Sequence, residues 1–467
     1  MKLDILGHQF SIFPKNNPIS QKIFEYRQDI LIVLSLAVIA GLASYYLAQL
    51  IDPVIVNKQV YNVWFDGDSP RVFAQMTSRS DYEHYRNKVH PLFSLIAYPP
   101  TFLLRKILGV EQLTAVRLVC AEVATLWISA LFTVLRLIGC LRLDATLFSI
   151  LGASSAASVF WFSVPETYSF GSLSILLAIG FVALTELRDF SFIWYTGVST
   201  LTLSFTTTNW MVGILATGVN HRWKKALQIT ATAYLLTTVL WLLTKKAFPH
   251  TQFFVGDSEE RAYLIRPDLR HLLQVAQSFF LHTMVMPAIK LVENDKAFQD
   301  LGWPMMSVQA SPLGSGSLLG TVSIWLWIAL LGLGLWGLFS IKKHLKLRIV
   351  IGLALLGQLA LHSVYGRETF LYSLHFAPLL VVLAGLSVLT RVRPLALVLA
   401  LILTLTVGIN NGLQFSKAIT VVQNSGPQHH RVQSQMRLPP SDPRTRGVGH
   451  VPLAKPDDHN GYIESLP

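Results

Sequence analysis

The stretch Ile30–Ile51, ILIVLSLAVIAGLASYYLAQLI, contains no charged residue and decides the class of the fold. A helix needs about 20 mainly apolar residues to cross the hydrocarbon core of a bilayer. Residues 1–29 are polar and include several basic side chains, so no cleavable signal is apparent. We therefore expect residues 1–29 to form a cytoplasmic segment and this run to remain as a membrane anchor.

The rest of the chain repeats this pattern. Of 467 residues, 52% are hydrophobic and only 14% are charged, whereas roughly 25% of residues are charged in an ordinary soluble domain. The mean hydropathy is +0.47. These values predict an all-α polytopic membrane protein with about eleven crossings. The expected crossings are residues 30–51, 112–135, 145–163, 168–186, 191–206, 209–220, 226–244, 317–340, 349–364, 371–390 and 394–412.

Basic residues alternate between the two sides of this arrangement. If the N-terminus is inside, every inner connection is basic, as short cytoplasmic loops usually are. The inner basic residues are Arg136, Arg142, Arg188, Arg222, Lys224, Lys225, Lys342, Lys343, Lys346, Arg348, Arg391 and Arg393. The short outer connections contribute only Arg367. Loop charges of this kind explain the net charge of +12, so we expect a lipid bilayer and no nucleic acid as partner.

Residues 191–220 test this arrangement of crossings, because the segment is too long for one crossing and short for two. Arg188 and Arg222 flank the segment and both belong inside, so the chain must turn back between them. We place the break at Thr206–Asn209. Backbone polar groups at such a break need partners, which implies burial against protein or a wet cavity.

Three long segments then lie outside: residues 52–111, 248–316 and 413–467. In the first, Leu92–Gly109 is apolar but interrupted by Pro99, Pro100 and two basic residues, which suits a helix lying in the membrane interface. Residues 267–292 of the second are apolar enough to dip into the interface. The tail is polar and rich in Pro, and either a disordered linker or a lid docked on the outer face fits its composition. Residues 30–412 are the expected transmembrane domain.

The first outer segment begins with VWFDGDSPRVFAQM, residues 63–76. Ser69 can cap a helix whose first turn contains Pro70, so Asp68 lies beside a helix N-terminus that favours its ionised form. Asp66 and Asp68 are then either turn and cap residues or paired functional carboxylates, and spacing alone leaves both readings open.

An ordered series of short motifs resembles the GT-C class of polytopic glycosyltransferases, the group that includes protein O-mannosyltransferases and the aminoarabinose transferases of lipid A. The series comprises DGDSPRVF, His90-Pro91, Arg117 near the start of the second crossing, and VPETYSF around Glu166. The resemblance covers residues 30 to 190 well, and the rest only in topology. It implies transfer of a sugar from a polyprenyl-phosphate donor to a glycan, lipid or protein acceptor on the extracytoplasmic face, with inversion. Relatives often have an acidic residue where this chain has Ser69.

The resemblance also implies roles for individual residues. Asp68 is expected to take the proton of the acceptor hydroxyl, with Asp66 and Glu166 beside it. A phosphate leaving group needs cations, or a divalent metal such as Mg or Mn held by Asp66 and Asp68. Arg367 is the first candidate for the phosphate, since Arg pairs with phosphate in a bidentate manner. Further substrate-binding candidates are His90, Arg71, Arg117, Glu368, His375, Lys245 and Lys246.

Other readings remain open. Arg117 and Glu122 lie within one crossing, and such residues often form a structural pair. A transporter or lipid flippase is the alternative to an enzyme, although transporters usually contain paired broken helices and here only one break is expected. A non-catalytic membrane scaffold is a third reading. The expected location is the inner membrane of a bacterium, with the site facing outward.

Overall fold

The computed structural model describes residues 3–5, 8–10, 18–58, 60–254, 261, 263–292 and 303–425. Helices account for most of them, and four short strands form two hairpins, β1–β2 and β3–β4. The elements before the break at Thr206 are β1 Leu3–Ile5, β2 His8–Phe10, α1 Pro18–Leu50, η1 Pro53–Val56, α2 Ser69–Thr77, η2 Tyr82–Lys88, α3 Phe93–Leu108, α4 Gln112–Leu137, α5 Arg142–Ser154, α6 Ala156–Trp161, α7 Thr167–Thr185 and α8 Phe192–Phe205. Those after it are η3 Thr207–Asn209, α9 Trp210–Gly218, α10 Trp223–Ala247, α11 Leu269–Gln277, η5 Ser278–His282, β3 Lys290–Val292, β4 Met305–Ser307, α12 Leu318–Ser340, α13 Leu345–His362, η6 Thr369–Tyr372, α14 Ser373–Gly385, η7 Leu386–Leu389 and α15 Arg393–Asn424.

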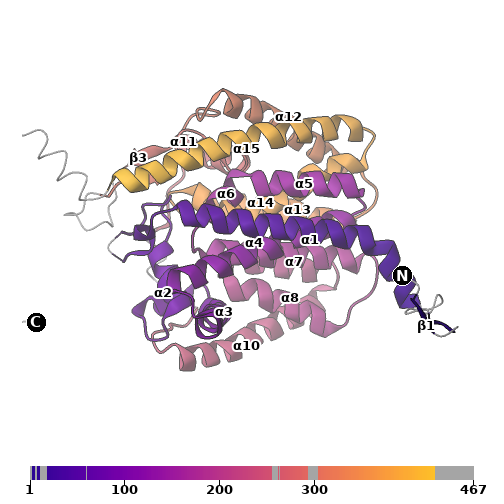
Figure 1. Ribbon diagram of the computed structural model, residues 1–467, viewed down its shortest axis with the longest axis horizontal. Coiled ribbons are helices and arrows are strands. Elements are labelled where there is room, and N and C mark those ends of the chain that lie inside the picture. Colours follow the sequence, from indigo (N-terminus) through magenta and orange to yellow (C-terminus); the bar gives the residue numbers. More distant parts are fainter. Residues whose placement is uncertain are drawn as a thin grey trace, which may run out of the picture.

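The described residues contain eight helices that are long and apolar enough to cross a membrane. They lie within α1, α4, α7, α10, α12, α13, the continuous segment from η6 to η7, and α15. Figure 1 shows the long helices running side by side along the length of the molecule. This confirms the general prediction of a helical integral membrane protein. The other three expected crossings correspond to shorter helices, so the count of eleven and the orientation stay predictions.

One of these shorter crossings is broken. Residues 145–163 form α5 and α6, which are separated at Ser155. The backbone groups freed at the break have partners elsewhere in the chain: Ala156 and Ala157 donate to carbonyls of residues 283–284, and Asn411 donates to the Ser154 carbonyl. The break is therefore stabilised by tertiary hydrogen bonds.

The centre of the bundle is the segment Thr369–Leu389, which is almost entirely buried. It packs against α7, α12, α13 and α5. α1 lies at the periphery on α4, where Gly41 allows close approach: a Cβ there would lie 2.5 Å from Thr125 Oγ1. The outward face of α1 carries exposed apolar side chains such as Val38, Ile39 and Leu42. Such a face is stable only against an apolar surrounding, as a bilayer provides.

The expected break between α8 and α9 is present at the expected place. α8 ends at Phe205, Thr206 is extended with φ −160°, and η3 leads into α9. α9 returns along α8, with Trp210 donating to Ser199 at 2.9 Å. The segment before α3 supplies the missing backbone partners. The Thr207 N–H donates to the Val89 carbonyl at 3.0 Å, and the Leu92 N–H donates to the Ser204 carbonyl at 2.9 Å.

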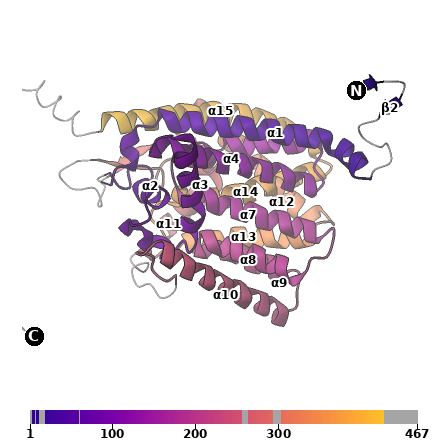
Figure 2. The same ribbon diagram turned by 60° about the horizontal axis from the view of Figure 1, so that its bottom comes forward.

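The segment that we expect to lie in the membrane interface is a helix, α3, and Figure 1 shows it end-on while the long helices run across the view. Figure 2 likewise places α2 and α3 together at one end of the bundle. A helix that crosses the bundle axis in this way has the direction expected of one lying in the plane of a membrane. Its exposed apolar side chains, including Phe102, Leu103 and Ile107, fit such a position.

Two boundaries differ from the sequence-based expectations. The helix after the acidic turn begins at Ser69, with Asp68 rather than Ser69 in the N-cap position. The final crossing does not end at residue 412, because α15 continues to Asn424 along a face where Gln414 and Phe415 are buried. Between residues 248 and 316, α11 is only nine residues long and passes into the π-helix η5, so it is too short to cross, in agreement with the expectation that this segment is not a crossing. The tail from residue 426, with its linker and lid readings, lies outside the described residues.

Candidate active site

The acidic turn before α2 has a backbone that few sequences tolerate. Asn62, Phe65 and Asp66 have φ values of +63°, +51° and +61°. Left-handed geometry is common for Asn and tolerated by Asp, but it is an outlier for a bulky aromatic residue. Strain of this kind costs roughly 1–3 kcal/mol per residue and persists only where surrounding contacts enforce it.

Aromatic packing enforces it here. The Phe65 side chain is fully buried, and its ring lies 5.3 Å from that of Phe370 and 5.6 Å from that of Phe160, both edge-on. Trp64 next to it donates to the Phe160 carbonyl at 3.1 Å. With two aromatic anchors in the core, the following residues Asp66, Gly67 and Asp68 are held at the end of the bundle.

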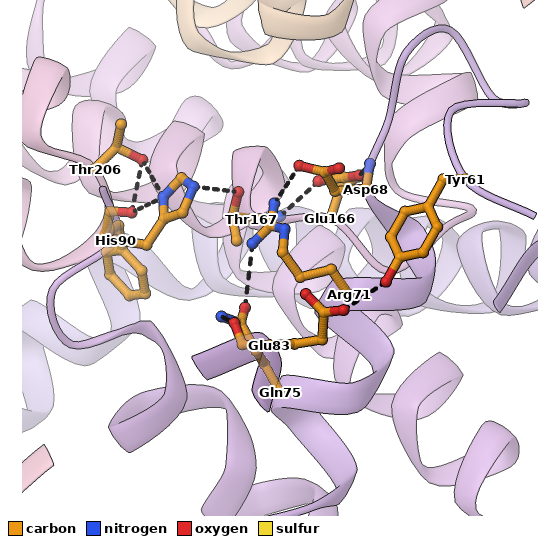
Figure 3. A network of polar contacts seen from close by, with 10 residues as sticks. Tyr61, Asp68, Arg71, Gln75, Glu83, His90, Glu166, Thr167 and Thr206 are labelled. Atoms are coloured by element: carbon orange, nitrogen blue, oxygen red, sulfur yellow. Dashed lines mark hydrogen bonds and ion pairs between the residues drawn. The ribbon is translucent and has the colours of Figure 1, made fainter. Parts of the chain in front are cut away.

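Asp68 is the best placed of the acidic residues for chemistry. Its carboxylate is 27% exposed and accepts a hydrogen bond from Arg71 Nη2 at 2.8 Å, whereas the Arg71 side chain is only 2% exposed. The same guanidinium donates to Gln75 Oε1 from Nη1 at 3.3 Å. Burial is the largest single influence on Arg71 and lowers its pKa, but the nearby Asp68, Glu166 and Tyr168 together outweigh it; the pKa is raised, so Arg71 stays cationic. Figure 3 shows these side chains converging.

Glu166 contacts the acidic turn from α7. It is fully buried at the start of α7, and its carboxylate accepts the Asp68 N–H at 2.5 Å and the Thr167 N–H at 3.2 Å. Burial raises its pKa to about 8, and the Asp68 charge adds to this, while Arg71 opposes it. Near neutral pH the site thus combines a cationic Arg71 with a mainly protonated Glu166.

Gly67 makes the close approach between the turn and Glu166 possible. A Cβ at this position would lie 2.8 Å from the Trp64 carbonyl oxygen, 3.1 Å from Glu166 Oε1 and 3.2 Å from the Trp161 ring. Two of these neighbours are backbone or packed aromatic, which cannot move aside cheaply. The glycine of the DGD sequence is therefore required sterically.

His90 joins this network to the break between α8 and α9. Its Nδ1 lies 2.7 Å from the Phe205 carbonyl and 3.1 Å from Thr206 Oγ1, and its Nε2 lies 3.4 Å from Thr167 Oγ1 (Figure 3). Burial lowers the pKa of His90 well below its usual range, and the nearby Arg71 and Arg86 charges add to this. A neutral His90 is thus part of the structure that holds the break.

A cavity of about 270 Å³ opens beside His90. Asp68 lies close enough to act electrostatically on Tyr168 and Tyr372, two residues of its wall. The remaining residues of the wall come from η2, η3, α13 and α14 and the segments beside them. They are Arg86, Lys88, Val89, His90, Thr206, Thr207, Thr208, Phe254, Leu361, His362, Tyr365 and His375.

The structure separates the predicted site residues into two groups. Asp68, Arg71, Glu166 and His90 lie in one network, and His375 is in the wall of the adjacent cavity. Asp66 lies near Glu368, where burial raises the pKa of Glu368 to about 7 and Asp66 adds to the increase. Glu368 also accepts from Ser307 Oγ and from the Val308 N–H, so it ties η6 to β4.

The predicted cations other than Arg71 lie elsewhere. Arg367 is exposed and is not part of the cavity wall. Lys245 donates to the Thr251 carbonyl at 2.8 Å, and Lys246 next to it is exposed. Arg117 donates to the Ile51 carbonyl at 2.9 Å and so holds the end of α1 on α4. The expected pairing of Arg117 with Glu122 is not formed, because Glu122 lies on an exposed face of α4.

Two cations of the cavity wall, Arg86 and Lys88, were missed from the sequence. Both belong to η2, three and one residues before Val89 and directly ahead of the predicted His90-Pro91 motif. Their position directly before the His90-Pro91 motif is the sequence feature that could have identified them as site residues. Lys88 also lies over the Tyr85 ring, 5.2 Å from its centroid.

The groups around the acidic turn bear on the metal hypothesis. Within the part of the chain that the structure describes, no group of three or more His, Cys, Asp or Glu side chains could hold a metal ion. Arg71 Nη2 lies 2.8 Å from Asp68 Oδ2, so this carboxylate oxygen already has a cationic partner. His84 follows the acidic turn in the sequence and is of a residue type that binds metals. Its Nδ1 contacts Ser94 Oγ at 2.8 Å and its Nε2 contacts the Ser78 carbonyl at 2.7 Å, so both ring nitrogens have structural partners.

Comparison with protein-family models and with curated proteins found no match to this sequence. The class of the protein, a helical integral membrane protein with a polar site at one end of its bundle, therefore rests on the fold and the site geometry.

Proposed function

We propose that the protein is a membrane glycosyltransferase of the GT-C type, which transfers a sugar from a polyprenyl-phosphate donor to an acceptor hydroxyl with inversion. The observation that carries the proposal is the partly exposed Asp68 carboxylate, held by a buried Arg71 and Glu166 beside a polar cavity. A carboxylate in this position can accept a proton, and its buried neighbours fix its orientation without blocking it.

The acceptor hydroxyl loses its proton to Asp68 while its oxygen bonds to the anomeric carbon. The bond from that carbon to the phosphate oxygen breaks, and polyprenyl phosphate leaves with the bonding electron pair. Arg71 favours the carboxylate form of Asp68 before the reaction. Since attack and departure occur on opposite faces of the anomeric carbon, the product has inverted configuration.

The leaving phosphate needs positive charge. Arg86 and Lys88 replace Arg367 as the first candidates, because they are in the wall of the cavity next to the Asp68 network. Both lie on η2, beside α3, a helix with the direction of one lying in the membrane plane. A phosphate with a lipid tail would reach this position from the bilayer. The proposed location is the extracytoplasmic face of a bacterial inner membrane.

The alternative, a transporter or flippase, gives Asp68 no bond-making role. Purified Asp68→Asn protein, assayed for sugar transfer from polyprenyl-phosphate donors to an extract of envelope acceptors, distinguishes the two. We expect turnover to fall by roughly 100-fold to 10,000-fold in protein that is still folded at the assay temperature, as for loss of a general base. The melting temperature should also fall, because the buried Arg71 loses its anionic partner. Asp66→Asn, which preserves a residue type that tolerates left-handed geometry, is the matched control and should retain most activity. Full turnover in Asp68→Asn would exclude the proposed base.

A further inference from the structure

A groove between α12 and α13 lies apart from the site around Asp68. The two helices follow each other in the chain and are joined by the short loop Ile341–His344, yet they hardly contact each other. Each packs instead against α14, and α12 also packs against η7. The space left between them is a groove of about 740 Å³, which reaches Leu383 of α14 and Phe280 of η5.

Two glycines keep this groove open. Gly332 of α12 and Gly352 of α13 are both in its wall, and a Cβ at either position would meet no atom of the described chain within 4 Å. Gly334 of α12 differs, because a Cβ there would lie 2.5 Å from the Leu383 carbonyl oxygen. A side chain at Gly332 or Gly352 would therefore have room to extend into the groove.

The rest of the groove wall is almost entirely apolar. Leu335 and Phe339 of α12 face Ile349, Leu353 and Leu356 of α13 across it, and all five side chains are exposed. Exposure of apolar surface to water is unfavourable, so the groove requires an apolar occupant. In a membrane this occupant is a hydrocarbon chain.

The length of the groove matches one leaflet of a bilayer. Its wall on α13 extends from Leu345 to Leu356. At 1.5 Å per residue, these positions lie about 16 Å apart along the helix, which is about half of the roughly 30 Å of the hydrocarbon core. The cavity beside His90 instead includes Leu361 and His362, near the opposite end of α13. The groove thus fits the acyl chains of one leaflet and is separate from the proposed donor site.

Positive charge lies at the end of the groove that is next to the loop. The segment IKKHLKLR, residues 341–348, contains four basic residues and no acidic one. Arg348 is itself in the groove wall, and its guanidinium donates to the Leu338 and Ile341 carbonyls at the end of α12. Lys342 is exposed and follows Ile341 directly, so its backbone lies beside the Arg348 guanidinium.

Glu186 is the acid that contacts this segment, and it lies outside the groove wall. Its carboxylate contacts His344 Nδ1 at 2.7 Å and accepts the Lys346 N–H at 2.9 Å. Among the described residues, no Asp or Glu lines the groove. The loop end of the groove therefore favours an anionic group.

We propose that this groove binds an anionic phospholipid such as phosphatidylglycerol, with an acyl chain along α12 and α13 and its phosphate beside Arg348 and Lys342. Basic pockets between membrane-spanning helices are typical sites for anionic headgroups. A guanidinium has five N–H donors, and the two carbonyls occupy two of those on Arg348. This lipid site goes beyond the proposed sugar transfer and does not depend on it.

Native mass spectrometry of the full chain in detergent, titrated with dioleoyl phosphatidylglycerol or dioleoyl phosphatidylcholine, tests the proposal. The two lipids have the same acyl chains, so a difference in affinity reports on the headgroup. We expect phosphatidylglycerol to bind roughly tenfold more tightly, because two basic side chains attract its net negative charge. Equal affinities would overturn the proposal.

A variant that fills the groove locates the lipid. Gly332→Leu combined with Gly352→Leu should weaken binding of phosphatidylglycerol by roughly tenfold or more, since the added side chains take the place of the acyl chain. Leu is a better helix former than Gly, so this variant should stay folded. Gly408→Leu combined with Gly412→Leu on α15 is the matched control, because a Cβ at either position also meets nothing within 4 Å. Parent affinity in the groove variant would overturn the proposal.

A charge reversal locates the headgroup. Lys342→Glu should remove the preference for phosphatidylglycerol, whereas Lys224→Glu, at an exposed position near the start of α10, should retain it. A preference that persists in Lys342→Glu would overturn the placement of the phosphate at this loop.

Bare polyprenyl phosphate identifies the occupant. It should bind equally to the parent and to the groove variant, because the proposed donor site lies near the other end of α13. If filling the groove abolished binding of polyprenyl phosphate and left phosphatidylglycerol unaffected, the groove would hold the chain of the donor lipid and the proposal would fail.

Discussion

The carboxylate of Glu166 accepts the backbone N–H of Asp68, a residue 98 positions earlier in the chain. This bond ties the start of α7 to the turn that precedes α2. It places a buried acid behind the partly exposed one, with Arg71 beside both. The orientation of Asp68 therefore depends on α7 as much as on its own turn.

Glu166 should make stability depend on pH. Its pKa is about 8 in the fold and about 4.5 when unfolded, so between these values only the folded state binds the proton. Stability then falls as the pH rises from about 4.5 to about 8. Glu166→Gln, which does not titrate, should flatten the dependence of melting temperature on pH over this window. Equal slopes for the two proteins would show that Glu166 is already ionised at low pH.

Gly67→Ala should reduce activity by roughly 100-fold, because the added Cβ must push the Asp68 turn away from Glu166 and Trp161. Gly197→Ala on α8 is the control, since a Cβ there meets nothing within 4 Å. That change should raise stability by roughly 0.5–1 kcal/mol, as for Gly to Ala within a helix. Both are checked by turnover and by urea unfolding. A fully active Gly67→Ala protein would show that the contact with Glu166 is dispensable.

Arg71→Met should lower kcat and destabilise the fold, because it leaves the Asp68 carboxylate without its cation. Well above pH 8, where Glu166 is ionised, adding Glu166→Gln should restore part of the lost stability, since it removes a buried charge that Arg71 no longer compensates. A double-mutant cycle of melting temperatures measures this coupling. Strictly additive effects would mean that the two side chains do not interact.

Arg86→Gln should raise KM for a polyprenyl-phosphate donor by roughly tenfold while kcat changes less, because it removes one charge-assisted contact to the phosphate. Lys343→Gln, on an exposed loop at the start of α13, is the charge-matched control. Initial rates over a range of donor concentrations separate the two parameters. An unchanged KM would place the phosphate away from η2.

The sequence predicts the helical bundle well, because apolar runs and basic loops report directly on burial in a bilayer. It also predicts the position of the break after α8 from the charges of Arg188 and Arg222. The break at Ser155 was not predicted, although Ser is a residue type that caps helices and the Ser155 side chain accepts the Ser158 N–H at 3.2 Å at the start of α6. It depends on hydrogen bonds to residues 283–284 and to Asn411, which only the folded chain brings together.

The candidate site was predicted only in part, because some of its contacts also form only in the folded chain. Asp68, Glu166 and His90 lie in recognisable motifs, and the structure brings them into one network. Arg367 was a reasonable phosphate ligand by position, but Arg86 and Lys88 are in the cavity wall instead. The side of η2 that faces the cavity is set by its tertiary contacts, such as those of His84. Contacts of this kind produce no periodic pattern in the sequence, so they could not be predicted from it.

Val89 and Leu92 complete the backbone hydrogen bonds at the junction between α8 and α9, so residues 52–111 cannot be exchanged independently of that helical hairpin. A chimera that receives this segment from another protein would leave carbonyl and amide groups of the hairpin unpaired. Moving the acidic turn into another protein would therefore require moving the α8–α9 hairpin with it.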